Sequence, residues 1–237
     1  MSDHVNRQVE FAVWGRSALF TDPITKLGGE KCSYHIPTYE ALKGIVKSIY
    51  WKPTIVWTIK AVRVVNRIRT QSRGVKLLAY GGGSDLAFYS YLVDVRYQVR
   101  AEFSWNETQQ GLVGDRNPIK HRAMIDRALD RGGRQDIFLG VRDCQGYVER
   151  CEFGEGAGHY DTSGEVAYGL MFHGFDYPDE SGRAVLESRF FRPTMTNGVV
   201  IFPTPDECTI RRVIRPFAAK RFGLGRSVDP VDQVVLD

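Results

Sequence analysis

The chain has 237 residues, of which 43% are hydrophobic and 25% charged, and this composition is typical of a globular protein with an ample core. The net charge of +4 permits a nucleic-acid partner without requiring one. No apolar segment has the length of a membrane span and no secretory signal opens the chain, so we expect a cytoplasmic protein with no membrane partner. The four cysteines lack zinc spacing, which favours free thiols and no metal or other cofactor.

The first third of the chain predicts a strand and a helix. Residues 7–15 alternate apolar and polar side chains, and a long connection follows that carries Lys26 and Lys31 beside a glycine pair. For these lysines, solvated loop charge and phosphate contact remain equally open. Thr38 can cap a helix that ends near Tyr50, ahead of a proline. Composition does not distinguish a core-edge aromatic at Tyr50 from a catalytic phenol.

Two strands are expected next, over residues 54–60 and 61–70, because both segments are rich in β-branched side chains. Basic residues follow along the second strand and the loop beyond it, at Arg63, Arg67, Arg69 and Arg73. Either these side chains face phosphates or they are solvated edge charges that discourage aggregation. The glycine run 81–83 fits neither a Rossmann nor a P-loop fingerprint and predicts a flexible loop. Residues 95–103 alternate regularly and predict the clearest strand.

A helix is expected within residues 115–134. Asn117 is a good N-cap residue, Pro118 suits the first helical position, and a glycine pair supplies the stop. Lys120 and His121 then lie in the first turn, where free N–H groups and the helix dipole favour an anion. The pair could bind or cut RNA, although a surface Lys–His pair is the plainer interpretation of these residues alone. Three carboxylates are available to a metal, but they are explained more simply as helix-start and surface charges: Asp115, Asp126 and Asp130.

A further strand over residues 136–142, which residues 146–153 can extend after a bend, completes the order strand, helix, strand, strand, helix, strand. This order predicts an α+β fold with a ferredoxin-like (RRM-like) N-terminal domain over residues 1–153. A smaller antiparallel β-rich C-terminal region is expected over residues 154–217, and a tail that is mobile or held by a partner over residues 218–237. The C-terminal strands are expected at residues 166–175, 184–191, 198–202 and 210–216. His159 and His173 lack metal-like partners there, which favours structural or surface roles.

Several segments between about Val9 and Pro205 carry a family resemblance: FAVWGRSALFTDPITKLGGEKCSYHIPTYEALKGIVKSIYWKPTI, YGGG, DRNPIKH, GGRQDIFLGVRDCQGYVERCEFG and HGFDYPDESG. Together they resemble the Cas family-five proteins of the Dvulg subtype, which are found in type I-C CRISPR systems and belong to the RAMP superfamily. The resemblance implies a ferredoxin-like domain with a β-rich extension, in agreement with the strand order. It also implies a metal-independent endoribonuclease that cuts precursor CRISPR RNA within its repeats and stays on the 5′ handle of the mature guide as a Cascade subunit.

The resemblance further implies a catalytic set of Tyr50, Lys120 and His121. The remaining expected partners are other Cascade subunits, namely the backbone and large subunits, and target DNA within that complex. The chemistry would be attack by the 2′-hydroxyl on the adjacent phosphate, for which His121 can move a proton at neutral pH. The RNA contacts are expected among the basic residues named above. Two rivals stay open: a non-catalytic RNA-binding scaffold, and a metal-dependent nuclease acting on DNA.

Overall fold

Strands dominate the computed structural model, which describes residues 6–23, 25–78 and 80–233. The ends of the expected N-terminal domain and tail, residues 1–5 and 234–237, lie outside it. Within the described residues, nine strands form one sheet in the order β5-β6-β1-β4-β2-β11-β10-β7, with β3 paired to β4, and three more form a sheet in the order β12-β9-β8. The pairs within both sheets are antiparallel. The strands are β1 (Gln8–Ala18), β2 (Ile55–Val64), β3 (Thr70–Leu78), β4 (Ser84–Trp105), β5 (Ile137–Phe138), β6 (Gln145–Arg150), β7 (Glu165–Ala167), β8 (Met171–Asp176), β9 (Val185–Phe191), β10 (Thr194–Thr196), β11 (Val199–Ile201) and β12 (Ile210–Pro216).

Few helices accompany these strands: α1 (Tyr39–Ile49), α2 (Pro118–Asp130), α3 (Pro178–Ser181) and four 3-10 turns, η1 (Thr25–Gly28), η2 (Gln110–Asp115), η3 (Pro205–Glu207) and η4 (Val231–Gln233). The predicted caps hold. The Thr38 hydroxyl accepts the Ala41 N–H at 3.1 Å, and the Asn117 side chain accepts the Lys120 N–H at 3.1 Å. No helix in the described part of the chain is both long enough and apolar enough to cross a membrane.

Hydrogen bonds join the segment that follows α2 to the last turn of α1. After α2, Gly132 and Gly133 adopt φ values of 79° and 108°, which glycine tolerates without a Cβ clash, and their N–H groups close the last turn. The next two residues, Arg134 and Gln135, donate backbone N–H groups to the Ser48 carbonyl of α1, each at 3.1 Å. The exit of α2 is therefore fixed to the last turn of α1.

The expected mixed fold of mostly antiparallel strands with few helices is confirmed, but several strand boundaries were wrong. The division at Lys60 is a bulge within one continuous strand, β2, where the register against β4 shifts between Ile59 and Ala61. Residues 136–142 form only the two-residue β5, and residues 166–175 are broken into β7 and β8. A bulge interrupts alternation as a strand end does, so sequence pattern alone does not separate them.

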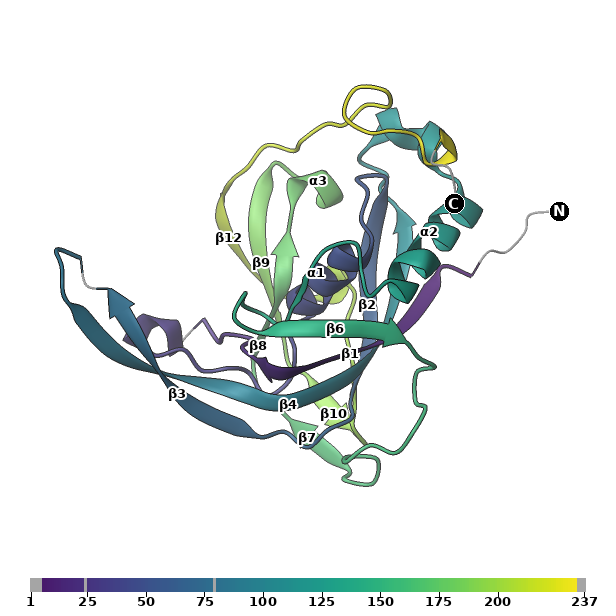
Figure 1. The fold of residues 1–237 in the computed structure, drawn as a ribbon. Coiled ribbons are helices and arrows are strands. Elements are labelled where there is room, and N and C mark those ends of the chain that lie inside the picture. The colour runs from purple at the N-terminus through teal and green to yellow at the C-terminus, as the bar shows by residue number, and fades with distance from the viewer. Residues whose placement is uncertain (1–5, 24, 79, 234–237) are drawn as a thin grey trace.

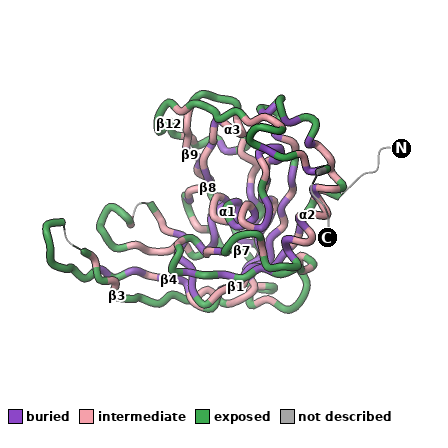
Figure 2. The backbone as a smooth tube through the Cα atoms, turned by 45° about the horizontal axis from the view of Figure 1, so that its top comes forward, coloured by how far each residue is buried: buried purple, intermediate pink, exposed green. Residues whose placement is uncertain are grey.

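A long hairpin arm was missed. Strand β3 pairs with Ser84–Leu92, the first part of β4, around the glycine run that was expected to be a loop. The arm projects away from the body of the molecule, on the side opposite α2 (Figure 1). Its backbone is largely exposed, whereas purple buried segments gather beneath α1 and α2 (Figure 2). No residue of β3 is fully buried, and only Val75 and Leu77 pack against the core, so its sequence carries little alternation to detect.

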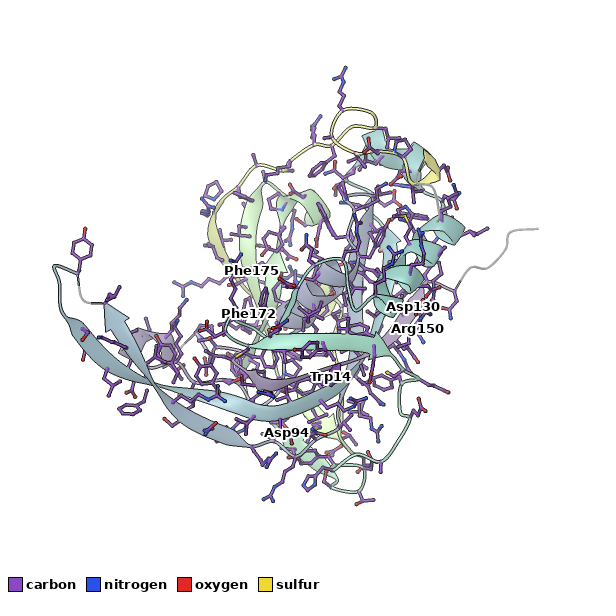
Figure 3. All side chains as sticks on the ribbon, viewed as in Figure 1. Trp14, Asp94, Asp130, Arg150, Phe172 and Phe175 are labelled. Atoms are coloured by element: carbon purple, nitrogen blue, oxygen red, sulfur yellow. The ribbon has the colours of Figure 1, made fainter. Side chains whose placement is uncertain are left out.

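The C-terminal strands extend the larger sheet and add the smaller one. Strand β11 pairs with β2, while β8 carries Phe172 and Phe175, whose ring centroids lie 4.9 Å apart (Figure 3). Within the smaller sheet, Arg189 of β9 is 1% exposed and forms an ion pair with Asp176 of β8. His173 is fully buried beside them, with its ring 4.0 Å from that of Tyr39 in a stacked arrangement. The structural role favoured for His173 is thus confirmed.

Acid should destabilise the fold through His173. Burial, aided by the Arg189 guanidinium, lowers the pKa of His173 to about 3. Between pH 6.5 and about 3 the unfolded chain binds a proton that the folded chain does not, so stability is lost as the pH falls through this window. Urea unfolding from pH 7 to pH 5 should show a mean pH dependence about 1 kcal/mol per unit shallower in His173→Gln than in the wild type. His159→Gln, at an exposed position, should keep the wild-type slope; equal slopes in all three proteins would contradict this account.

Candidate active site

Tyr50 and His121 meet between the end of α1 and the start of α2. The Tyr50 hydroxyl lies 2.8 Å from His121 Nδ1, and both residues are 0% exposed. Two bonds fix the Tyr50 backbone: its N–H donates to the Val46 carbonyl at 2.9 Å, and its carbonyl accepts the Trp57 indole N–H at 2.9 Å. The structure thus brings two of the three expected catalytic residues into contact, from positions 71 residues apart.

The hydrogen bonds of His121 define its proton. Nε2 lies 2.8 Å from the Asp115 backbone carbonyl, which can only accept, so Nε2 carries the hydrogen. Burial lowers the pKa of His121, against the opposing effect of Asp115. The ring is therefore neutral at pH 7, with Nδ1 unprotonated, and Tyr50 donates its hydroxyl hydrogen to Nδ1. This geometry presents a base to the phenol.

Asp115 is not the helix-start charge that its sequence position suggested, because its side chain is completely buried. Its carboxylate accepts from Lys52 Nζ at 2.9 Å, from the Thr54 hydroxyl at 2.5 Å and from the Val231 backbone N–H. One oxygen lies 3.6 Å from His121 Nε2. If His121 takes a proton, this carboxylate faces the resulting imidazolium, as in other buried carboxylate–histidine pairs.

Lys120 lies in the first turn of α2 as predicted, with 32% of its side chain exposed. Its ammonium donates to the Asp232 backbone carbonyl at 2.9 Å and lies 3.7 Å from the Asp232 carboxylate. The segment that was expected to be a mobile or partner-bound tail therefore contacts this site over its described residues. Arg134 adds a second cation, 5.7 Å from the Tyr50 ring centroid. Burial raises the pKa of Tyr50, and Arg134 partly opposes this rise.

The basic residues predicted to bind RNA lie elsewhere. Arg63 is 4% exposed, and its guanidinium is bound by Asp161, the Gln98 side chain and two backbone carbonyls, which indicates a structural role. Lys31 and Arg73 lie on the hairpin arm side, over the rings of Tyr89 and Tyr91 at 4.9 and 5.0 Å. The other three residues, Lys26, Arg67 and Arg69, are exposed. Of these three, an ion pair within the described residues is observed for Arg69 alone, with Asp94 at 2.6 Å. None is brought to the Tyr50–His121 pair by an observed contact.

The remaining carboxylates of α2 are surface charges, as expected. Asp130 forms an ion pair with Arg150 of β6 (Figure 3), and Asp126 pairs with Arg122 at 3.0 Å. Across the residues that the structure describes, no group of three His, Cys, Asp or Glu side chains has an arrangement that could hold a metal ion.

Sequence reasoning from the residues missed Asp115, Lys52 and Asp232. The Asp115 carbonyl bonds His121 six residues away, but its carboxylate meets Lys52 across 63 residues, and Asp232 meets its partners across 112 or more. A local motif carries no signal for such contacts. The Tyr50–His121 proximity was likewise predicted only by the family resemblance.

Comparison with known proteins adds a family to this geometry. A family model described as "CRISPR-associated protein (Cas_Cas5)" matches residues 9–203. The CRISPR pre-crRNA endoribonuclease Cas5d of Mannheimia succiniciproducens is 28% identical over 221 residues, covering 83% of this chain and 95% of that protein. Its Thermus thermophilus namesake is 33% identical over 149 residues, covering 59% and 62%. A crystal structure of a CRISPR-associated protein is 36% identical, with a TM-score of 0.75, and covers 87% of this chain and 97% of that one.

Proposed function

The chain belongs to the Cas5 family of CRISPR-associated proteins, as a type I-C member of the RAMP superfamily, and from this premise we propose that it is an endoribonuclease that cuts precursor CRISPR RNA within its repeats. The observation that carries the proposal is the hydrogen bond between the Tyr50 hydroxyl and the unprotonated Nδ1 of the buried, neutral His121. The two Cas5d relatives named as pre-crRNA endoribonucleases support the same activity.

The proposed reaction needs no metal. The 2′-hydroxyl attacks the adjacent phosphate, the bond from phosphorus to the 5′-oxygen breaks, and the products are a 2′,3′-cyclic phosphate and a 5′-hydroxyl. Tyr50 accepts the 2′-hydroxyl proton as its own proton passes to His121 Nδ1. The imidazolium then faces the Asp115 carboxylate at 3.6 Å. His121 is thus the final proton acceptor, and Tyr50 is the group that touches the RNA.

Lys120 is proposed to stabilise the charge that builds on the phosphorane. An ammonium at a helix start suits this role, because the free N–H groups and the helix dipole add to its field. The leaving 5′-oxygen must gain a proton, which the Lys120 ammonium can supply directly or through water. Tyr50, Lys120 and His121 together therefore cover both proton transfers and the charge.

We extend the proposal to architecture and partners. The sheet order β6-β1-β4-β2, with α1 and α2 in the connections, supports a ferredoxin-like unit over residues 1–153, followed by the β-rich region 154–217 and the terminal segment 218–237. After cleavage the protein is proposed to keep the 5′ handle of the guide as a subunit of type I-C Cascade. Its RNA-binding residues are Lys26, Lys31, Arg67, Arg69 and Arg73, where two of the cations already lie against tyrosine rings. We leave Arg63 out because it is buried.

Purified protein incubated in EDTA with RNA of its own CRISPR repeat should give one cut whose 5′ fragment ends in a 2′,3′-cyclic phosphate. The same RNA with a 2′-deoxy sugar at the cut should bind with unchanged affinity and stay intact, because the attacking hydroxyl is missing. Gel analysis with end-group mapping measures both. Tight binding without a cut would favour the non-catalytic scaffold, and cutting of the deoxy substrate would rule out attack by the 2′-hydroxyl.

A further inference from the structure

The segment after β12 runs back across the molecule and ends beside the start of α2 (Figure 1). We call residues 228–232 the strap. Its apolar side chains are inserted into the protein, with Val228 8% and Val231 0% exposed. The Val231 N–H donates to the carboxylate of Asp115, the residue that also holds His121. The strap therefore lies directly against the side of the site formed by Asp115.

The strap places a carboxylate at the start of α2. Asp232 accepts from the Asn117 side-chain amide at 2.8 Å through its carboxylate, and from Lys120 Nζ at 2.9 Å through its backbone carbonyl. The Asn117 side chain faces two ways, because its oxygen caps the Lys120 N–H while its nitrogen holds Asp232. An anion is thus already bound at the position where the helix start and Lys120 favour one.

With the strap in place, RNA does not reach the catalytic pair, since Tyr50 and His121 are both 0% exposed. The polar contacts that hold the strap at α2 are those of a surface segment. Asp232 has 52% of its side chain exposed, and exposed ion pairs contribute little to stability. A strap held in this way can be displaced by a ligand that competes for the same groups.

We propose that the strap occupies the place of the scissile phosphodiester, that Asn117 and Lys120 hold that phosphate once the strap leaves, and that RNA must displace the strap before it is cut. This inference rests on the proposed function and adds Asn117 as a substrate-binding residue. The strap acts as a competitor within the chain. It lowers the apparent affinity for RNA and leaves the cleavage rate at saturating RNA unchanged.

The test compares Asp232→Ala with Asp229→Ala in the full-length chain. Both variants remove one negative charge from the strap, but the observed hydrogen bond of Asp229 is made by its backbone carbonyl, which accepts from Lys52 and is kept in the variant. With repeat RNA as substrate, the concentration for half-maximal cleavage should fall about 3–10-fold in Asp232→Ala and stay at the wild-type value in Asp229→Ala, because one hydrogen bond and one exposed ion pair are removed only in the first. The rate at saturating RNA should be equal in all three proteins.

A second measurement does not depend on cleavage. Amide hydrogen exchange at Val231 should accelerate when repeat RNA with a 2′-deoxy sugar at the cut is bound, because the bond to Asp115 opens. The strap proposal is overturned if the half-maximal RNA concentration is unchanged in Asp232→Ala, or if the Val231 amide stays protected with RNA bound. In either case, cutting by the wild type would leave the proposed function standing. If the wild type binds repeat RNA without cutting it, the proposed function fails, and the amide exchange at Val231 still decides the strap proposal. If the protein binds no repeat RNA, both the proposed function and the strap proposal are contradicted.

Discussion

Tyr50→Phe should slow the cutting of repeat RNA by about 10²–10⁴-fold, the usual contribution of a positioned proton-transfer group. The substitution removes only the hydroxyl, so the buried ring keeps its packing while the 2′-hydroxyl loses its proton acceptor. His121 Nδ1 loses its partner at the same time, so stability should fall by about 1–3 kcal/mol. Single-turnover cleavage at saturating protein measures the chemical step, and thermal unfolding confirms that the variant is folded.

The matched control for this variant is Tyr97→Phe, which deletes the same atom from another buried tyrosine. Tyr97 lies on β4 with 2% of its surface exposed, and its ring packs against Phe20, with the centroids 6.2 Å apart. It should cut RNA at the wild-type rate. A Tyr50→Phe protein that cuts as fast as Tyr97→Phe would remove Tyr50 from the mechanism and leave His121 without a route to the RNA.

Asp115→Ala should lower the free energy of unfolding by about 3–5 kcal/mol, because removal of one partner from a buried ion pair leaves the other without compensation. The Lys52 ammonium, which keeps 13% of its side chain exposed, would lose its carboxylate. The Thr54 hydroxyl and the Val231 N–H would lose an acceptor as well. Chemical denaturation at pH 7 measures the loss, and Asp115→Asn should lose less because the amide oxygen still accepts hydrogen bonds.

Asp126→Ala provides the comparison for that measurement. Asp126 also forms ion pairs, with Arg122 and Arg150, but it lies at the surface with 28% of its side chain exposed. Its removal should cost no more than about 1 kcal/mol. Equal losses in the Asp115 and Asp126 variants would mean that Asp115 is not the structural centre of the site.

The features predicted from sequence are those encoded within a few residues of one another. The caps Thr38 and Asn117 and the glycine stop of α2 are local, so both helices were predicted almost to the residue. By contrast, the burial of Asp115 depends on Val231, 116 residues further along the chain, and the burial of Arg63 on Asp161, 98 residues away. Such burial is a property of the packed molecule, and in the sequence both residues look like ordinary surface charges.

The fold class followed from element order, whereas strand lengths did not. A buried strand shows alternation because one face meets the core, and only residues 95–103 of β4 were predicted from this pattern. Its arm half pairs with β3 and also buries Ala87, Tyr89 and Tyr91 on one face, an alternation that the sequence analysis overlooked. Arg73 of this arm was noticed within a basic run and Lys31 in a separate loop, and their positions over the tyrosine rings of the arm appeared only in the structure.

Strand β4 links the hairpin arm to the catalytic region through one unbroken backbone. It runs from Ser84 in the arm to Trp105, whose ring centroid lies 5.6 Å from that of His121, and at about 3.3 Å per residue its contour is roughly 70 Å. Midway, Asp94 adopts a φ of 53°, a left-handed conformation that aspartate tolerates better than most residues, and its carboxylate binds Arg69 (Figure 3). Asp94 thus lies where the hairpin arm joins the body, and the pairing of β4 with β1 passes there from Val93 opposite Ser17 to Val95 opposite Gly15.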